Sequence, residues 1–462
     1  MTRLVDVNST IVALATALGS GSIAVIRLSG KNALSIGNKI FTGEDLEKAP
    51  PNTIHFGRIV YNSREIDQVM VAIFHQPHSY TGENSLEISC HANPLIVDMI
   101  VESLLDNGAV MAGAGEFTLR AFLNGKIDLT QAEAVSSLIA AKTKHATKNA
   151  LEHLEGALQN RVEFVKNSVM DSISLLELDL DFSEEDIAIA DPGQIAGRVG
   201  KAKKNIQALI DSYNYARIFN SGLHLTIIGK PNSGKSTLLN VLLGENRAIT
   251  SHIPGTTRDT ISEEIIIQNI LFKIVDTAGL REAKDNIEAE GIRRTQTQID
   301  LADLILLLVD RSEEMNGEDK KIIQTLQKAY GGKVFIVLNK IDKPENKKTR
   351  DYVYKLNLSR IEISAREEQN IDELKNKIVN HFAETIDQFE DETVITSRRQ
   401  LDLLEKCAGA LERGARTLKR GLGNELAAID LREALNALGE LSGEITTDDI
   451  LDNIFSKFCI GK

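Results

Sequence analysis

Residues 229–236 read Gly-Lys-Pro-Asn-Ser-Gly-Lys-Ser, which is the composition of a phosphate-binding loop. The apolar residues 225–228 precede the loop and a helix-favouring stretch follows it, so the order strand, glycine-rich loop, helix is predicted. Such a loop turns backbone N–H groups toward phosphate oxygens at a helix N-terminus. Lys235 would neutralise phosphate charge, and the Ser236 hydroxyl would bind Mg²⁺. The predicted contacts here are Asn232, Ser233, Gly234, Lys235, Ser236 and Thr237, with Lys235 also catalytic.

Three later motifs each follow an apolar, strand-like run. They are Asp276-Thr277-Ala278-Gly279, Asn339-Lys340-Ile341-Asp342 and Ser364-Ala365-Arg366. Residues after strand C-termini meet at the edge where an open α/β sheet binds its ligand. Asp276 would hold the Mg²⁺ shell through water, and Gly279 would offer its N–H to a γ-phosphate. The Asp342 carboxylate accepts from the N1–H and the exocyclic amine of guanine, which adenine does not match, so GTP is the predicted nucleotide.

The residues expected to position the attacking water differ from the Ras pattern. Ras-like proteins place a glutamine directly after this Asp-x-x-Gly motif, and this chain has Leu280 there. Thr257 is the favoured switch threonine for Mg²⁺, and Arg258 is either an arginine finger or part of a switch salt bridge. The carboxylates beyond Leu280 are candidates for orienting water, or belong to a solvated loop: Glu282, Asp285, Glu288 and Glu290.

The secondary structure predicted to position these residues changes along the chain. Residues 1–120 are predicted to form an α+β domain, residues 121–217 and 384–462 are helical, and residues 218–383 form a Ras-like P-loop domain. The fold class is therefore multidomain α/β plus all-α. The two helical segments form either one domain with the P-loop domain inserted, or two separate bundles.

Bulk composition limits the classes of partner. The 462 residues carry a net charge of −13, which argues against gripping nucleic acid by overall charge, although residues 398–420 form a basic stretch that either contacts phosphates or is a solvated helix face. Three cysteines with no paired motif fit a reducing cytosol, and no stretch of eighteen apolar residues predicts a membrane span. A cytoplasmic protein is expected.

Stretches outside the nucleotide motifs resemble one family, the MnmE (TrmE) bacterial tRNA modification GTPases, from end to end. The resembling stretches are Ser79-Tyr80-Thr81-Gly82-Glu83, Gly115-Glu116-Phe117, Arg120-Ala121-Phe122-Leu123-Asn124, Asp276-Thr277-Ala278-Gly279-Leu280-Arg281-Glu282 and Phe458-Cys459-Ile460-Gly461-Lys462. The resemblance implies a folate-binding-like N-terminal domain that forms a homodimer. It also implies a flavoprotein partner, MnmG (GidA), which carries FAD and assembles with this chain as a heterotetramer. Together they would add a (carboxymethyl)aminomethyl group to C5 of the wobble uridine, position 34, of certain tRNAs, using a tetrahydrofolate one-carbon unit.

The resemblance also assigns roles to single residues. Those implied to bind a tetrahydrofolate derivative are Arg27, Glu87, Lys126 and Lys462. The resemblance implies a bound K⁺ that stabilises transition-state charge in a site without the glutamine. Its implied ligands are Asn232, Ser251, Ile253 and Thr256. The switch loop implied to contact GTP comprises Ser251, His252, Ile253, Pro254, Gly255, Thr256 and Thr257. Glu288 would orient the water, and Cys459 is a candidate for the modification chemistry or a free thiol.

Two other functions fit the motifs. One is a regulatory or ribosome-assembly GTPase whose flanking domains bind partners, and the other is a folate-dependent transferase in which GTP is regulatory. Binding of a reduced folate separates the first from the family function. Dependence of the tRNA modification on Lys235 separates the second.

Overall fold

The structure is a computed structural model, and it describes residues 6, 8–17, 19, 21–181, 191–220, 222–246, 262–276, 297–383 and 394–461. The chain divides into two compact units. The first contains residues 1–136, 153–204 and 403–462, and the second contains residues 137–152 and 205–402. The predicted domain borders stay predictions.

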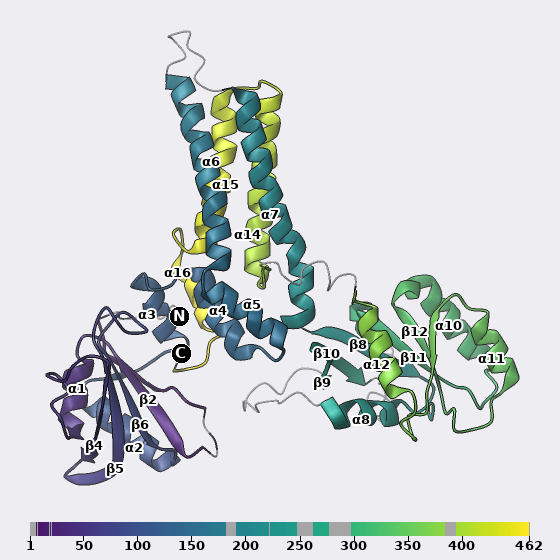
Figure 1. The fold of residues 1–462 in the computed structure, drawn as a ribbon, viewed down its shortest axis with the longest axis horizontal. Helices are drawn as coiled ribbons and strands as arrows, with labels where there is room; N and C mark the ends of the chain where they lie inside the picture. The colour runs from purple at the N-terminus through teal and green to yellow at the C-terminus, as the bar shows by residue number, and fades with distance from the viewer. Residues whose placement is uncertain are drawn as a thin grey trace, which may run out of the picture. The chain divides into compact units, whose positions relative to one another are not determined.

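A seven-stranded sheet builds the N-terminal part of the first unit, in the order β3-β4-β5-β6-β2-β1-β7 (Figure 1). The strands are β1 (Ile11–Leu14), β2 (Ile23–Ser29), β3 (Phe41–Thr42), β4 (Thr53–Tyr61), β5 (Arg64–Phe74), β6 (Ser85–His91) and β7 (Val110–Met111). All neighbouring pairs are antiparallel except β1 with β7. Helices α1 (Ala33–Ile40) and α2 (Pro94–Asp106) share a core with the buried faces of these strands. This mixed composition is the predicted α+β domain.

Long helices from two distant parts of the sequence pack together in the first unit. They are α6 (Ala157–Asp181), α15 (Asn424–Ser442) and the parts of α7 (Pro192–Asn220) and α14 (Arg398–Lys419) that belong to this unit. Arg432 of α15 forms an ion pair with Glu177 of α6 at 2.5 Å, and Lys203 of α7 with Glu412 of α14 at 3.1 Å. The two helical segments therefore form one domain, which confirms that the P-loop domain is inserted between them.

Shorter helices α3 (Glu116–Leu123), α4 (Leu129–Ala140) and α5 (Lys144–Leu154) lie between the sheet and α6 in the sequence, and α16 (Asp448–Phe455) follows α15. Leu151 and Leu154 lie on α5, and Leu158 lies on α6. The two helices are separated at Gly156, whose φ of +90° lies in the left-handed region.

The second unit contains a six-stranded sheet in the order β13-β12-β11-β8-β10-β9. Its strands are β8 (Leu223–Gly229), β9 (Ser262–Ile267), β10 (Ile270–Asp276), β11 (Leu304–Asp310), β12 (Val334–Asn339) and β13 (Ser359–Glu362), and only β9 is antiparallel to its neighbour. The helices are α8 (Lys235–Asn246), α10 (Gly317–Tyr330), α11 (Lys347–Tyr354) and α12 (Ile371–Asn380), with a short 3₁₀ turn η3 (Gly331–Lys333). β11 and β12 are buried along almost their whole length, as expected for strands covered on both faces.

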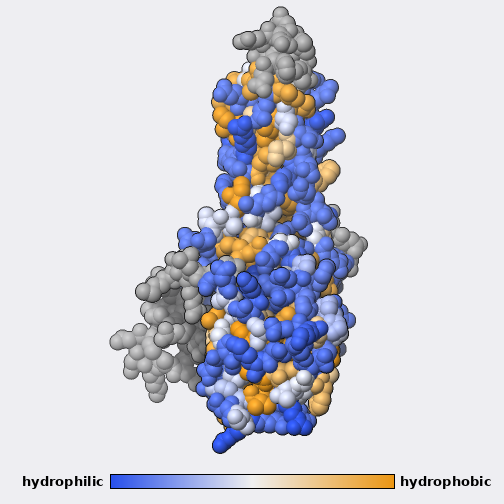
Figure 2. Space-filling model, turned by 90° about the vertical axis from the view of Figure 1, so that its left-hand side faces the viewer, coloured by the Kyte–Doolittle hydropathy of each residue, from blue (hydrophilic) through white to orange (hydrophobic). Residues whose placement is uncertain are grey.

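The molecular face drawn in Figure 2 is mainly hydrophilic, with apolar side chains in short separate patches. Among the described helices, none combines the length and the hydropathy that crossing a bilayer requires.

Candidate nucleotide-binding site

The glycine-rich loop joins the end of β8 to the start of α8, as its sequence predicts. The Lys235 Nζ donates to the carbonyl oxygens of Gly229 at 2.9 Å and Lys230 at 2.7 Å. The Ser233 hydroxyl donates to the Lys230 carbonyl at 2.9 Å, and Asn232 has a φ of +64°. The loop thus wraps around the Lys235 ammonium group at a helix N-terminus, which is the arrangement that binds phosphate.

Asn339, the last residue of β12, joins this loop to the Ser364-Ala365 motif. Its side-chain amide donates to the Ser233 carbonyl at 2.8 Å, and its side-chain oxygen accepts from the Ala365 N–H at 2.9 Å. A Cβ atom at Gly234 would lie 2.2 Å from the Asn339 amide nitrogen. Glycine is therefore required at position 234 by contact as well as by its φ of +99°.

Asp342, the predicted guanine reader, is held by Ser364. The Ser364 hydroxyl donates to a carboxylate oxygen of the exposed Asp342 at 2.7 Å. This hydrogen bond holds the pKa of Asp342 below its ordinary value, so the carboxylate remains an acceptor. The N–H of Ile341 donates to the Ile363 carbonyl at 3.2 Å, which ties the two motifs together through the backbone as well.

Lys340 forms an ion pair with Asp310, the last residue of β11. Burial acts to raise the pKa of Asp310, but the hydrogen bonds from Lys340 and Ser312 outweigh it and keep that pKa below its ordinary value. Arg366 extends into solvent, with its side chain 79% exposed and 3.6 Å from Glu367. The positive charge of Arg366 still contributes to lowering the pKa of Asp342, after the larger effect of the Ser364 hydrogen bond.

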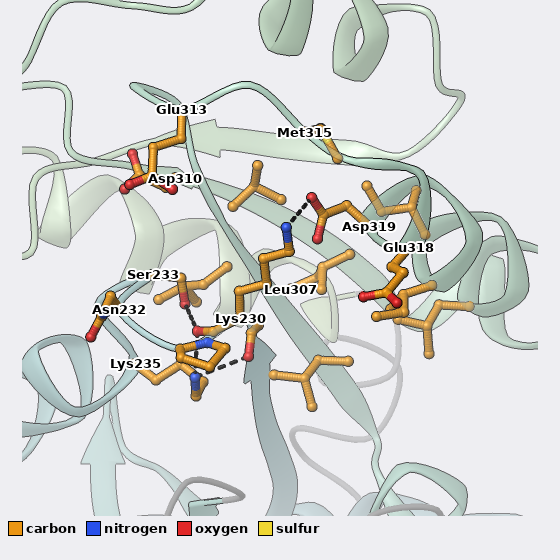
Figure 3. Close-up of a pocket in the computed structure, with 18 of the residues that line it drawn as sticks. Lys230, Asn232, Ser233, Lys235, Leu307, Asp310, Glu313, Met315, Glu318 and Asp319 are labelled. Carbon is orange, nitrogen blue, oxygen red and sulfur yellow. Dashed lines mark hydrogen bonds and ion pairs between the residues drawn. The ribbon is translucent and has the colours of Figure 1, made fainter.

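A cavity of about 570 Å³ is lined by the phosphate loop together with residues of β8, β11 and α10. Figure 3 shows Lys230 reaching Asp319 across it, with the two charged groups 2.5 Å apart, while Lys235 turns back under the loop. The acidic side chains at its edge include Asp310, Glu313, Glu314, Glu318 and Asp319. These carboxylates would repel a polyphosphate, so the acidic part of this cavity is unsuited to nucleotide phosphates.

The predicted Mg²⁺ ligand Ser236 and its neighbour Thr237 lie exposed on the first turn of α8. Asp276 ends β10, which pairs in parallel with β8, and the description of this residue is limited to its backbone. The remaining predicted contacts lie outside the described residues: Ser251, His252, Ile253, Pro254, Gly255, Thr256, Thr257, Thr277, Ala278, Gly279, Glu288 and Lys462. Leu280, Arg258 and the other acidic candidates, Glu282, Asp285 and Glu290, lie outside them too.

Two of the residues with an implied folate role, Arg27 and Glu87, pair directly. They face each other on β2 and β6, and their charged groups lie 2.7 Å apart. The Arg27 guanidinium also lies 5.4 Å from the centre of the Tyr80 ring. The third residue, Lys126, donates to the Pro77 carbonyl at 3.0 Å, so both cations border the loop of residues 77–83.

Cys459 is an exposed free thiol on a C-terminal segment that docks against the N-terminal sheet domain. The Cys459 carbonyl accepts from the Gly115 N–H at 3.4 Å, and Ile460 bridges Ala114. A Cβ at Gly461 would lie 2.2 Å from the Leu14 carbonyl oxygen, so only glycine allows this approach. Leu14 follows Ala13 in β1, and Ala13 pairs with Arg27 of β2, so Gly461 lies against the strand next to the one that carries Arg27.

The basic stretch of residues 398–420 is less free to contact phosphate than its composition indicates. At least four of its seven cations lie in ion pairs on or near α14: Arg398 with Asp402, Lys406 with Glu440, Arg413 with Asp430 and Glu433, and Arg416 with Glu412. These contacts favour a solvated, ion-paired helix face.

Sequence reasoning missed the bridging role of Asn339 and two ion pairs, Lys230–Asp319 and Lys340–Asp310. Asp310 carried a usable signal, because it follows a buried strand whose end meets the same sheet edge as the motifs. Lys230 and Asp319 carried none, since their pairing depends on where α10 packs.

Comparison with known proteins adds the family. Residues 10–126 match the model of the GTP-binding protein TrmE N-terminus, and residues 129–459 match the MnmE helical domain. A tRNA modification GTPase MnmE of Flavobacterium johnsoniae is 41% identical over 464 residues, covering 98% of this chain and 99% of that protein. The tRNA modification GTPase MnmE of Thermotoga maritima is 41% identical over 457 residues, covering 98% and 100%.

Among solved structures, a variant of Aquifex aeolicus Era bound to GDP and aluminium fluoride is 31% identical, with 41% of this chain and 66% of that chain covered. Its TM-score of 0.28 is too low for the overlay to support an argument. The full-length matches and the assembled nucleotide motifs make this chain a GTP-binding, GTP-hydrolysing enzyme with a P-loop domain set between helical segments. The chain belongs to the MnmE (TrmE) family of tRNA modification GTPases.

Proposed function

We propose that this GTPase acts on tRNA together with a flavoprotein partner of the MnmG (GidA) type, which carries FAD. The pair adds a (carboxymethyl)aminomethyl group to C5 of the wobble uridine, and a tetrahydrofolate derivative supplies the one-carbon unit. The observation that carries the GTP-dependent part is the contact of Asn339 with both Ser233 and Ala365, because it joins the phosphate loop and the guanine motifs into one site.

In this site each side chain has a separate task. Asp342, held ionised by Ser364, accepts from guanine, and the loop amides with Lys235 bind the phosphates. Ser236 and Thr257 are oxygen donors of the type that Mg²⁺ prefers, and the exposed Asn232 offers an amide oxygen suited to K⁺ together with Ser251, Ile253 and Thr256. A bound monovalent cation would supply positive charge opposite the charge that develops during hydrolysis. Glu288 is the proposed water-orienting carboxylate.

The folate part rests on the Arg27–Glu87 pair and on Lys126, with Lys462 as the fourth residue. Two cations and a carboxylate suit a ligand that has a carboxylate tail and a donor-rich pterin edge. Burial raises the pKa of Tyr80, so its ring remains a neutral, partly apolar surface beside Arg27. The proposal also includes a homodimer through the N-terminal domain, assembly with the partner as a heterotetramer, a cytoplasmic location, and Cys459 as a candidate participant in the modification.

Nucleoside mass spectrometry of tRNA tests this proposal. Cells lacking the protein should lose the modified wobble uridine, wild type should restore it, and Lys235→Ala should not. The exposed Lys328→Ala of α10 serves as the matched control and should restore it fully. Unchanged tRNA in the deletion strain would contradict the proposal and favour a regulatory GTPase, whereas restoration by Lys235→Ala would favour a transferase in which GTP is dispensable.

A further inference from the structure

The connection between α4 and α5 contacts the β9–β10 hairpin of the P-loop domain. Although residues 137–152 are flanked in sequence by residues of the first unit, they belong to the second. The Lys144 N–H, at the first position of α5, donates to the side-chain oxygen of Asn269 at 2.8 Å. Lys142 forms an ion pair with Glu264 of β9. We call residues 141–147 the elbow.

The elbow is also fixed from its other side. The Thr143 hydroxyl donates to the Phe219 carbonyl at 3.4 Å and accepts from the Ala146 N–H at 3.1 Å, so it caps α5. The His145 ring lies 4.6 Å from the Phe219 ring. Thr143 and Ala146 are buried, at 4% and 3% exposed, so the elbow has little freedom to shift without its neighbours.

The hairpin that the elbow contacts is formed by β9 and β10, which run from the turn toward the proposed nucleotide site. Its turn consists of Gln268 and Asn269, both in the left-handed region with φ of +47° and +67°. The side chain of Gln268 contacts Asn376 of α12, so each turn residue holds a different helix. At the opposite end, β10 finishes at Asp276 and β9 begins five residues after Thr257 in the sequence.

The turn of the hairpin and the end of β10 at Asp276 are separated by the length of the paired strands. The seven residues of β10 span roughly 20 Å at about 3.3 Å per residue, and β9 pairs with β10 along its whole length. A tilt or slide of the paired strands at Asp276 therefore displaces Asn269. The elbow must follow that displacement or lose the hydrogen bond from the Lys144 N–H.

We propose that the elbow is a relay that follows the β9–β10 hairpin, so that the identity of the nucleotide is transmitted to α4 and α5. This inference rests on the nucleotide site proposed above. Asn269 is the positioning residue, since it accepts from the first free N–H of α5. The alternative is a static brace whose contacts are the same with every nucleotide.

Hydrogen–deuterium exchange of the full chain separates these two, with GDP and with a non-hydrolysable GTP analogue as the ligands. In the wild type, the amides of residues 141–148 should exchange at different rates with the two nucleotides. Asn269→Ala should abolish that difference and speed exchange of the Lys144 amide by about two- to tenfold, as expected for loss of one neutral hydrogen bond. Lys144→Ala is the matched control, because the contact uses the backbone N–H, and it should keep the nucleotide-dependent difference.

A second variant guards against a folding defect in the first. Lys142→Ala removes only a partly exposed ion pair and should reduce the difference while melting at the wild-type temperature. Equal exchange with both nucleotides in the wild type, or a difference that persists in both variants, would overturn the relay. Fluorescent-nucleotide binding is measured alongside: a chain that binds neither nucleotide would overturn the nucleotide-site assignment and the relay with it, whereas normal binding with equal exchange would overturn the relay alone.

Discussion

The side-chain amide of Asn339 donates to the carbonyl oxygen of Ser233 across 2.8 Å, linking two motifs that lie 106 residues apart. The same side chain accepts from Ala365, and Asn339 is only 2% exposed. A residue of the proposed base-binding motif thus supports the phosphate loop, and a change at Asn339 affects both parts of the proposed nucleotide site.

We therefore expect Asn339→Ala to destabilise the P-loop domain as well as weaken GTP binding. The change leaves the Ser233 carbonyl and the Ala365 N–H without their partner, which should cost about 1–3 kcal/mol of unfolding free energy. Denaturant unfolding of the full chain measures this cost. Asn380→Ala, an exposed amide at the end of α12, is the control and should change stability by less than about 0.5 kcal/mol. Equal stability of the two variants would disprove the bridging role.

Asp342→Asn should shift base preference from GTP toward xanthosine triphosphate. The new amide no longer accepts from guanine N1–H, whereas xanthine presents an acceptor that the amide meets. Competition binding with both nucleotides measures the shift, and Asp351→Asn on the exposed face of α11 should leave it unchanged. Unaltered GTP affinity in Asp342→Asn would show that the guanine motif is assigned wrongly.

Hydrolysis should depend on K⁺ and slow by about 10²–10³ when Na⁺ is the sole monovalent cation, because Leu280 supplies no help to the developing charge. Asn232→Ala should lose most of the K⁺ stimulation yet still bind GTP, since Lys235 and the loop amides remain. Glu288→Ala should slow the chemical step without removing the cation response. Asn240→Ala, exposed on α8, should behave like wild type. Equal turnover in KCl and NaCl at matched ionic strength would reject the cation and point to Arg258.

Arg27→Ala and Lys126→Ala should each weaken binding of a reduced folate by roughly ten- to a hundredfold, the expected loss for one charge-assisted contact. GTP affinity should stay at the wild-type value because these residues lie in the other unit. Calorimetry gives both affinities. The control is Arg58→Ala, which breaks an exposed ion pair with Glu65 on the same sheet. A wild-type chain that binds no folate would remove this assignment.

At pH 8 the native protein should expose one reactive thiol, that of Cys459. Burial raises the pKa of Cys90 to about 11 and that of Cys407 to about 12, so both stay protonated well above pH 8 as well as shielded. Titration with a thiol reagent should find one group per native chain and three after denaturation. The Cys459→Ser variant should react with the thiol reagent only after it is unfolded. Reaction of the native variant would contradict the burial of Cys90 and Cys407.

Much of the nucleotide site follows from the sequence because its motifs are local. A strand end followed by glycine, lysine and serine sets the loop's backbone shape and charge by itself. The structure places Lys235 at the start of the helix after that loop, Asn339 at the end of β12, and Asp342 and Ser364 shortly after β12 and β13. Alternation of strand and helix likewise predicted the α/β P-loop domain, whereas its insertion into one helical domain was one of two alternatives.

Other relationships depend on register and packing, which no short window of sequence contains. Arg27 and Glu87 are 60 residues apart, and they pair because β2 and β6 align in one register; a shift by one residue would put them on opposite faces. The elbow's contact with Asn269 and the approach of Gly461 to Leu14 arise in the same way, from elements brought together by their buried faces. Local residue types determined the chemistry at each strand end, and the tertiary structure decided which distant side chains share a site, because side-chain pairing across elements is set by the packing of whole strands and helices.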